Sequence, residues 1–176
     1  MKILLLGANG QLGKSIVFTK PRDLELFAFS KKDLNILNKI NLKKIILKYQ
    51  PDWIINASAY TQVDKAEIKK ELAFKINKDG PKILAQVIND YGGHLLHIST
   101  DFVFDGNNKI PYLPTTKTNP ISTYGLSKSL GEQEIKNIFH LSHRGIILRT
   151  SWLMGPFGNN FATTIMKLHS EKEIIK

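Results

Sequence analysis

The sequence predicts an α/β protein with a doubly wound parallel sheet and helices on both faces. Short apolar runs alternate along the chain with longer segments whose apolar residues recur three and four positions apart. Proline or paired glycine stands at the joins, as at Pro51, Gly92 with Gly93, and Pro120. Alternation of strand and helix is typical of a parallel sheet, because each crossover must return the chain to the same end. The 176 residues, 42% of them hydrophobic, have the length and composition of one domain, residues 1–176.

Five apolar runs are the expected strands, and we expect them to be buried on both faces of the sheet. They cover residues 3–6, 24–29, 53–55, 95–98 and 146–148. Between them, helical spacing predicts helices that end near Thr19, that contain residues 42–49, and that contain residues 83–91. A further helix is expected after Pro120 and another over residues 161–168, and residues 173–176 resemble the start of one more strand.

Composition excludes several classes of protein. The absence of cysteine rules out disulfides, thiol nucleophiles and thiolate zinc sites. A run of only four apolar residues precedes the first glycine, too short for a signal peptide or a membrane span, so we expect a cytoplasmic protein without a membrane segment. The net charge of +10 is compatible with an anionic ligand. The lysines are scattered rather than gathered in one stripe, which favours a solvated surface and no nucleic-acid partner.

A glycine-rich turn follows the first expected strand directly. The segment GANGQLG places glycines at positions 7, 10 and 13, immediately before a helix. Such a turn lets the backbone approach a pyrophosphate, whose charge the amides at the helix N-terminus then meet. This placement predicts a Rossmann-type NAD(P)-binding domain.

The end of the second strand bears on which dinucleotide is preferred. An acidic residue there pairs with the ribose hydroxyls, whereas a basic residue tolerates a 2′-phosphate. Here the strand runs into Ser30, Lys31 and Lys32. Lys31 therefore favours NADPH, although both lysines are also compatible with being solvated charges, and NADH stays an alternative.

Tyr124 and Lys128 form a Tyr-x-x-x-Lys pair in a segment expected to be helical. Spacing of four places both side chains on one face, where the ammonium can lower the phenol pKa and reach a cofactor ribose. Such a tyrosine can exchange a proton with a carbonyl oxygen while hydride is transferred to its carbon. Ser99 and Thr100 end the fourth strand, at the sheet edge where ligands bind in this kind of fold.

The histidines are weaker candidates. His140 and His143 lie three apart in a polar connection without a neighbouring carboxylate motif, so we expect surface positions and no metal site. His94 and His97 flank the expected fourth strand, and we interpret both as structural.

Five segments together resemble the extended short-chain dehydrogenase/reductases, and within them the dTDP-4-dehydrorhamnose reductases. They are GANGQLG, PDWIINASAYTQVDKAE, HISTDFVFDG, YGLSKSLGE and ILRTSWLMGPFGNNF, in that order along nearly the whole chain. The resemblance implies that Tyr124 donates a proton, that Lys128 orients the nicotinamide ribose and tunes Tyr124, and that Thr100 hydrogen-bonds the reacting oxygen. It implies substrate contacts from Thr100, Asp101 and Trp152. Its implied cofactor contacts are Gly7, Gly10, Gln11, Leu12 and Gly13 around the phosphates, Asn35 and Ile36 at the adenine, and Ala59, Tyr60 and Thr61 along the nicotinamide half.

The chain departs from this family at three points. Asn35 stands where the family usually has Asp, and Phe102 replaces a usual Tyr. The family is also considerably longer, and its additional part supplies most of the substrate lobe. We therefore expect a fragment or a shortened protein in which most of the C-terminal substrate lobe is missing.

The resemblance implies reduction of dTDP-4-dehydro-6-deoxy-L-mannose to dTDP-L-rhamnose by NADPH or NADH, a step toward cell-surface polysaccharide. The partner is then a nucleotide-sugar, and a homodimer is left open. A non-catalytic subunit resembling the regulatory subunit of methionine adenosyltransferase is one alternative. Another nucleotide-sugar epimerase, reductase or dehydratase is a second, and a cofactor-binding remnant without turnover is a third.

Overall fold

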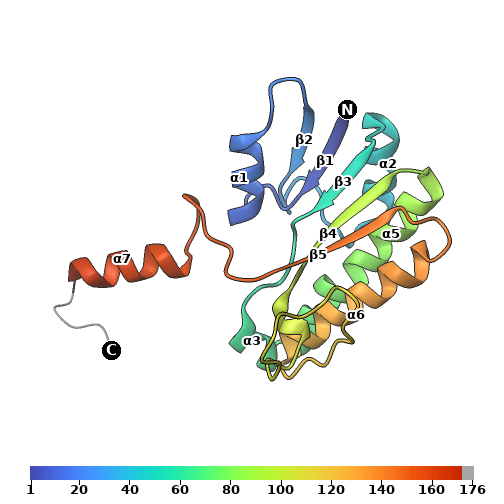
Figure 1. Cartoon of the computed structure of the whole chain (residues 1–176). Coiled ribbons are helices and arrows are strands. Elements are labelled where there is room, and N and C mark those ends of the chain that lie inside the picture. The colour runs from blue at the N-terminus through green and yellow to red at the C-terminus, as the bar shows by residue number, and fades with distance from the viewer. Residues whose placement is uncertain (172–176) are drawn as a thin grey trace.

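A five-stranded parallel sheet forms the centre of the molecule. The computed structural model describes residues 1–171, so the expected strand at 173–176 lies outside the described residues. The strands are ordered β2-β1-β3-β4-β5, which is a doubly wound arrangement because β2 and β3 lie on opposite sides of β1 (Figure 1). Their bounds are β1 Lys2–Leu6, β2 Glu25–Phe29, β3 Trp53–Asn56, β4 His94–Thr100 and β5 Gly145–Thr150.

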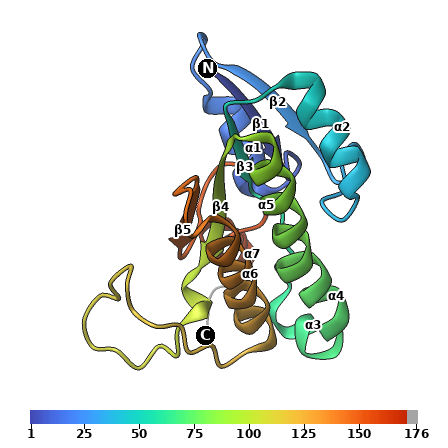
Figure 2. The same ribbon diagram turned by 90° about the vertical axis from the view of Figure 1, so that its right-hand side faces the viewer.

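Helices cover both faces of the sheet, but unequally. Figures 1 and 2 show α1 on one face and α2, α5 and α6 side by side on the other, while α7 extends away from the sheet. The helices are α1 Gln11–Thr19, α2 Lys39–Tyr49, α3 Val63–Ile68, α4 Lys70–Phe74, α5 Gly80–Tyr91, α6 Thr123–Phe139 and α7 Phe161–Glu171. A π-helical turn, Lys75–Asp79, joins α4 to α5, and a 3₁₀ turn, Asp101–Val103, follows β4. None of these helices combines the length and apolar character that crossing a membrane requires.

Local sequence explains where the main helices begin and end. Asn38 and Ser122 precede α2 and α6, and their side chains accept hydrogen bonds from the first-turn amides. Proline stands in the first turn of α5, and Gly92 ends that helix with φ of 102°. Leucine and isoleucine on the inner faces of these helices pack on the central strands in one core, which includes Leu4, Leu42, Ile54, Ile88 and Leu95.

The expectation that all five strands are buried on both faces is wrong. Only β1 is buried along nearly its whole length, because it lies between two neighbouring strands and between helical layers. The edge strands β2 and β5 are partly exposed, and Ile146 and Leu148 of β5 are each 48% exposed. The histidine prediction also needs correction, since His94 and His97 lie within β4 rather than beside it.

Candidate functional site

A cavity of about 610 Å³ opens at the carboxyl edge of the sheet. It lies where the strand order reverses around β1, the position at which ligands bind in doubly wound folds, and its size is within the usual range of ligand pockets. Ten of the residues predicted from sequence line it. They are Gly10, Gln11, Leu12, Ala59, Thr61, Thr100, Asp101, Tyr124, Lys128 and Trp152.

Gly7 and Gly13 do not line the cavity, and their role is to bring backbones together. Gly7 has φ of 84°, and a Cβ there would lie 2.7 Å from the backbone of Ala57 in the neighbouring chain segment. A Cβ on Gly13 would collide with the carbonyl oxygen of Gly7. These two glycines therefore allow α1 to begin close to β1 and β3, while Gly10 alone of the three faces the cavity.

Tyr60 points away from the cavity into a small core cluster. Its ring packs with Ala66, Ala73 and Tyr124, and its hydroxyl is buried without a hydrogen-bond partner among the described residues. The Asn77 side chain fixes the backbone of Tyr60, accepting from its N–H at 2.8 Å and donating to its carbonyl at 2.9 Å. Sequence reasoning missed Asn77, because the two residues are brought together only by the turn after α4.

The residues after β2 lie apart from the cavity lining. Lys31 and Lys32 are exposed, and Asp33 accepts hydrogen bonds from both the N–H and the hydroxyl of Ser30, which lower the pKa of Asp33. The Asn35 side chain accepts from the Leu37 amide. Ile36 is buried in the core, so its side chain packs inside the protein and cannot meet a ligand in the cavity.

Helix α6 carries Tyr124, Lys128 and Glu132 at intervals of four residues, and all three are buried. The predicted shared face of Tyr124 and Lys128 is therefore confirmed. The predicted lowering of the Tyr124 pKa by Lys128 is not what the structure shows. Burial raises the pKa of Tyr124 above its usual 10, and the neighbouring Thr100 hydroxyl opposes this shift only in part.

Lys128 lines the cavity, and groups on β4 hold its side chain in place. Its side-chain nitrogen donates to the carbonyl of Ile98 at 2.6 Å and lies 3.2 Å from Nε2 of His97. The residue is 2% exposed, and this burial lowers the pKa of Lys128 to about 8, against the opposing charge of Glu132. The Lys128 amine is therefore a weaker base than an ordinary lysine side chain in water.

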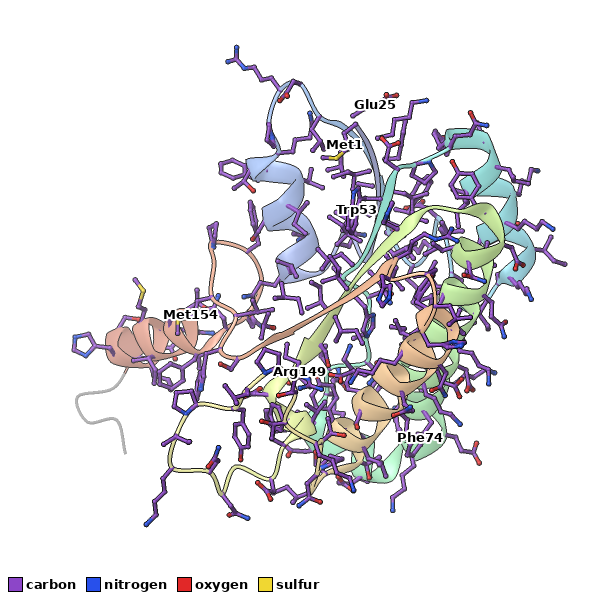
Figure 3. All side chains as sticks on the ribbon, turned by 45° about the vertical axis from the view of Figure 1, so that its right-hand side comes forward. Met1, Glu25, Trp53, Phe74, Arg149 and Met154 are labelled. Atoms are coloured by element: carbon purple, nitrogen blue, oxygen red, sulfur yellow. The ribbon has the colours of Figure 1, made fainter. Side chains whose placement is uncertain are left out.

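Glu132 anchors an ion pair that links α6 to β4 and β5. It accepts two hydrogen bonds from the Arg149 guanidinium, at 2.7 and 2.9 Å, and one from the Ser99 hydroxyl at 2.6 Å. Arg149 lies where β5 faces α6 (Figure 3). Burial raises the pKa of Glu132, but these hydrogen bonds outweigh it, so its pKa lies below the usual value. Sequence reasoning missed this pair, because its members lie on different elements.

Replacing Arg149 by Met is expected to destabilise the protein by about 3–5 kcal/mol, because it leaves the buried Glu132 carboxylate unpaired. Urea denaturation at neutral pH measures this loss. Lys136→Met is the matched control: Lys136 contacts the same carboxylate at 3.5 Å but is 52% exposed, so its loss is expected to cost no more than about 1 kcal/mol. Equal losses of stability in Arg149→Met and Lys136→Met would contradict the pairing.

The stability that Arg149 contributes should also depend on pH. Because folding lowers the pKa of Glu132, this contribution should disappear as the pH falls through that lowered value.

The segment after β5 folds back over the start of α1. The Gln11 amide donates to the carbonyl of Leu153 at 2.6 Å, and Phe157 packs edge-on against Phe18 at 5.6 Å. This contact adds Leu153, Gly158 and Asn159 to the cavity wall. No local pattern predicts it, since it joins opposite ends of the chain, although the last of the five motif segments contains these residues.

The fold and the residues around the cavity together define the class of protein. A glycine turn before α1, a cavity at the reversal of strand order, and a Tyr-Lys pair on the helix beside it are the features of a short-chain dehydrogenase/reductase-type protein. The family model described as the RmlD substrate-binding domain matches residues 1–176. The chain belongs to this family.

Curated relatives and solved structures agree with this assignment. The chain is 39% identical over 176 residues to a dTDP-4-dehydrorhamnose reductase of Aggregatibacter actinomycetemcomitans, covering 99% of this chain and 59% of that protein. It is 36% identical to the Escherichia coli enzyme of the same name, covering 98% and 58%. The crystal structure of dTDP-4-dehydrorhamnose reductase from Bacillus anthracis in complex with NADP superposes with a TM-score of 0.92 at 39% identity, covering 98% of this chain and 60% of that one. The chain thus spans about 60% of the length of these relatives.

Proposed function

We propose that this protein is the cofactor-binding part of an NAD(P)H-dependent reductase that converts dTDP-4-dehydro-6-deoxy-L-mannose to dTDP-L-rhamnose. The observation that carries the proposal is the meeting of the glycine turn with Thr100, Tyr124 and Lys128 around one cavity. The names of the relatives supply the substrate class. A nucleotide-sugar and NADPH are both found inside the cell, so the proposed reaction places the protein in the cytoplasm.

The residues at the start of α1 and after β3 and β2 fit a bound nicotinamide dinucleotide. Gly10 is the N-cap of α1 and offers no side chain to cap it, so the first amides of the helix are free to meet a pyrophosphate. Gly10, Gln11 and Leu12 would hold the phosphates, and Ala59, Tyr60 and Thr61 would follow the nicotinamide half. Because the Tyr60 side chain is turned into the core, its contact would come from the backbone. Asn35 and Ile36 would meet the adenine, Ile36 again through its backbone.

Tyr124 is suited to be the proton donor. A bound nicotinamide cofactor supplies hydride to the carbonyl carbon of the sugar. The alkoxide oxygen that develops needs a proton, and the Tyr124 hydroxyl carries one, because burial raises its pKa and keeps it protonated at neutral pH. The Thr100 hydroxyl would hydrogen-bond the same oxygen, and Lys128 would contact the cofactor ribose. Asp101 and Trp152, which also line the cavity, would contact the substrate.

Replacing Lys31 by Glu is expected to weaken NADPH binding by about 10- to 150-fold, since a charge-assisted contact to the 2′-phosphate contributes roughly 1.5–3 kcal/mol. Calorimetric titration with both cofactors measures the effect. NADH affinity should change little in the same variant. Lys44→Glu, which makes the same change of net charge on an exposed position of α2, should leave both affinities unchanged. Equal losses for NADPH and NADH would refute this role of Lys31.

Oxidation of NADPH that depends on dTDP-4-dehydro-6-deoxy-L-mannose tests the proposed reaction, with dTDP-L-rhamnose identified as the product. The assay uses the protein at the full length that its gene encodes. NADPH binding without any sugar-dependent oxidation would reject the reductase and favour a regulatory subunit or a remnant.

A further inference from the structure

His97 is a buried histidine that contacts Lys128. It lies in the middle of β4 and is fully buried. Its Nδ1 atom is 3.0 Å from the side-chain nitrogen of Asn56 on the neighbouring strand β3, and its Nε2 atom is 3.2 Å from the Lys128 nitrogen. His97 thus connects β3 to α6, the helix that carries Tyr124 and Lys128.

The neighbours of Asn56 fix which ring nitrogen of His97 carries the proton. The Asn56 side-chain oxygen accepts from both the N–H and the hydroxyl of Ser58, at 3.1 and 2.6 Å. The amide nitrogen, a donor only, therefore faces His97 and donates to Nδ1. Because Nδ1 accepts, the neutral ring carries its proton on Nε2. Burial lowers the pKa of His97 well below its usual 6.5, so the ring is neutral at neutral pH.

This tautomer directs an N–H at the nitrogen of Lys128. An ammonium group has no lone pair and cannot accept that hydrogen bond, whereas a neutral amine can accept it and still donate to Ile98. The other ionisable groups around the pair lie on α6 and β5. Tyr124 is one helical turn before Lys128 and is protonated, and Glu132 is one turn after it with its carboxylate held by Arg149, Ser99 and Lys136. Glu132 favours the ammonium, and burial opposes it.

We propose that His97, with its tautomer fixed by Asn56, is a positioning residue that holds Lys128 in place and favours its neutral amine over the ammonium form. Burial already brings the lysine pKa to about 8, and an N–H directed at its nitrogen lowers it further. On the proposed function, the lysine that would contact the cofactor ribose is then one that gains and loses its proton near neutral pH.

A pH titration of the lysines by NMR, with carbon-13 at Cε, tests the proposal on the whole chain without cofactor. One lysine signal, assigned by its loss in Lys128→Met, should titrate at about pH 8 or below, well under the value of about 10.4 that is general for an unperturbed lysine side chain. In His97→Gln the introduced amide can turn its oxygen toward the Lys128 ammonium and accept a hydrogen bond from it. The pKa of Lys128 should therefore rise by about one unit or more. His94→Gln, the same substitution on an exposed position of β4, should not move it. A Lys128 signal that titrates with the other lysines, or that is unmoved in His97→Gln, would overturn the proposal.

A second measurement needs no variant. Nitrogen-15 NMR of the parent protein reports the tautomer of each histidine, and His97 should be neutral with its proton on Nε2 at neutral pH. A proton on Nδ1, or a charged ring, would reject the proposal even if His97→Gln fails to fold. Neither measurement involves NADPH, so a protein that shows the expected tautomer and lysine pKa but binds no dinucleotide would reject the proposed function and leave this inference intact.

Discussion

Tyr124→Phe is expected to lower kcat for the dTDP-4-keto sugar by about 10²–10⁴-fold, the usual contribution of a general acid, and to leave NADPH affinity unchanged. The substitution removes only the hydroxyl. The ring, which packs with Ala66, Ala73 and Phe102, keeps its place, so the fold should be retained. Steady-state kinetics of the full-length gene product and a parallel NADPH titration measure the two quantities.

Tyr91→Phe provides the matched control, because it removes the same atom from α5, outside the cavity lining. Its kcat should equal that of the parent. Lys128→Met should differ from both by weakening NADPH as well, since it removes the proposed ribose contact. A Tyr124→Phe protein with the parent kcat would show that this tyrosine is only a packing residue of α6.

Gly10→Val is expected to abolish dinucleotide binding while leaving the domain folded. Gly10 has φ of −73° and ψ of 168°, a conformation open to any residue, and a Cβ there would meet only the Gly7 carbonyl oxygen, at 3.3 Å. The branched side chain would instead fill the space in front of the first α1 amides. Losing two charge-assisted hydrogen bonds, at about 1.5 kcal/mol each, lowers affinity by at least ~100-fold.

Gly93→Val is the control for this substitution. Gly93 precedes β4 at the opposite edge of the sheet, and a Cβ there would make a similarly tight contact, 3.2 Å from the Tyr91 ring. Calorimetric titration with NADPH should show normal affinity for Gly93→Val, and circular dichroism should show that both variants are folded. Unchanged affinity in folded Gly10→Val would mean that the dinucleotide does not lie against the 7–13 turn.

Local patterns were sufficient to predict the parts of this protein that depend on neighbouring residues. The glycine turn before α1, the helix that presents Tyr124 and Lys128 together, and the strand ending at Thr100 are each set by a few consecutive residues. Burial of the strands was predicted less well, because it depends on each strand's place in the sheet. An apolar run such as 146–148 has the same sequence character at an edge as at the centre.

The electrostatics of the site could not be predicted from the sequence, because they arise from side chains far apart in the chain. His97 and Lys128 are 31 positions apart, and Ser99 and Glu132 are 33 apart. Their contacts exist only once α6 has packed on β4. The same packing buries Tyr124 and raises its pKa, where the spacing of the Tyr-Lys pair alone suggested that its pKa would be lowered.

Titration of the nitrogen-15-labelled chain with NADPH, followed by amide NMR, tests most directly whether this cavity binds a nicotinamide dinucleotide. We expect saturable shifts at residues 10–12 of the glycine turn, at 59–61 after β3, at 98–101 at the end of β4, and at Tyr124 and Lys128. These segments are distant in sequence and meet only around the cavity. Saturable shifts confined to other surfaces, or no saturable shift at all, would contradict the account.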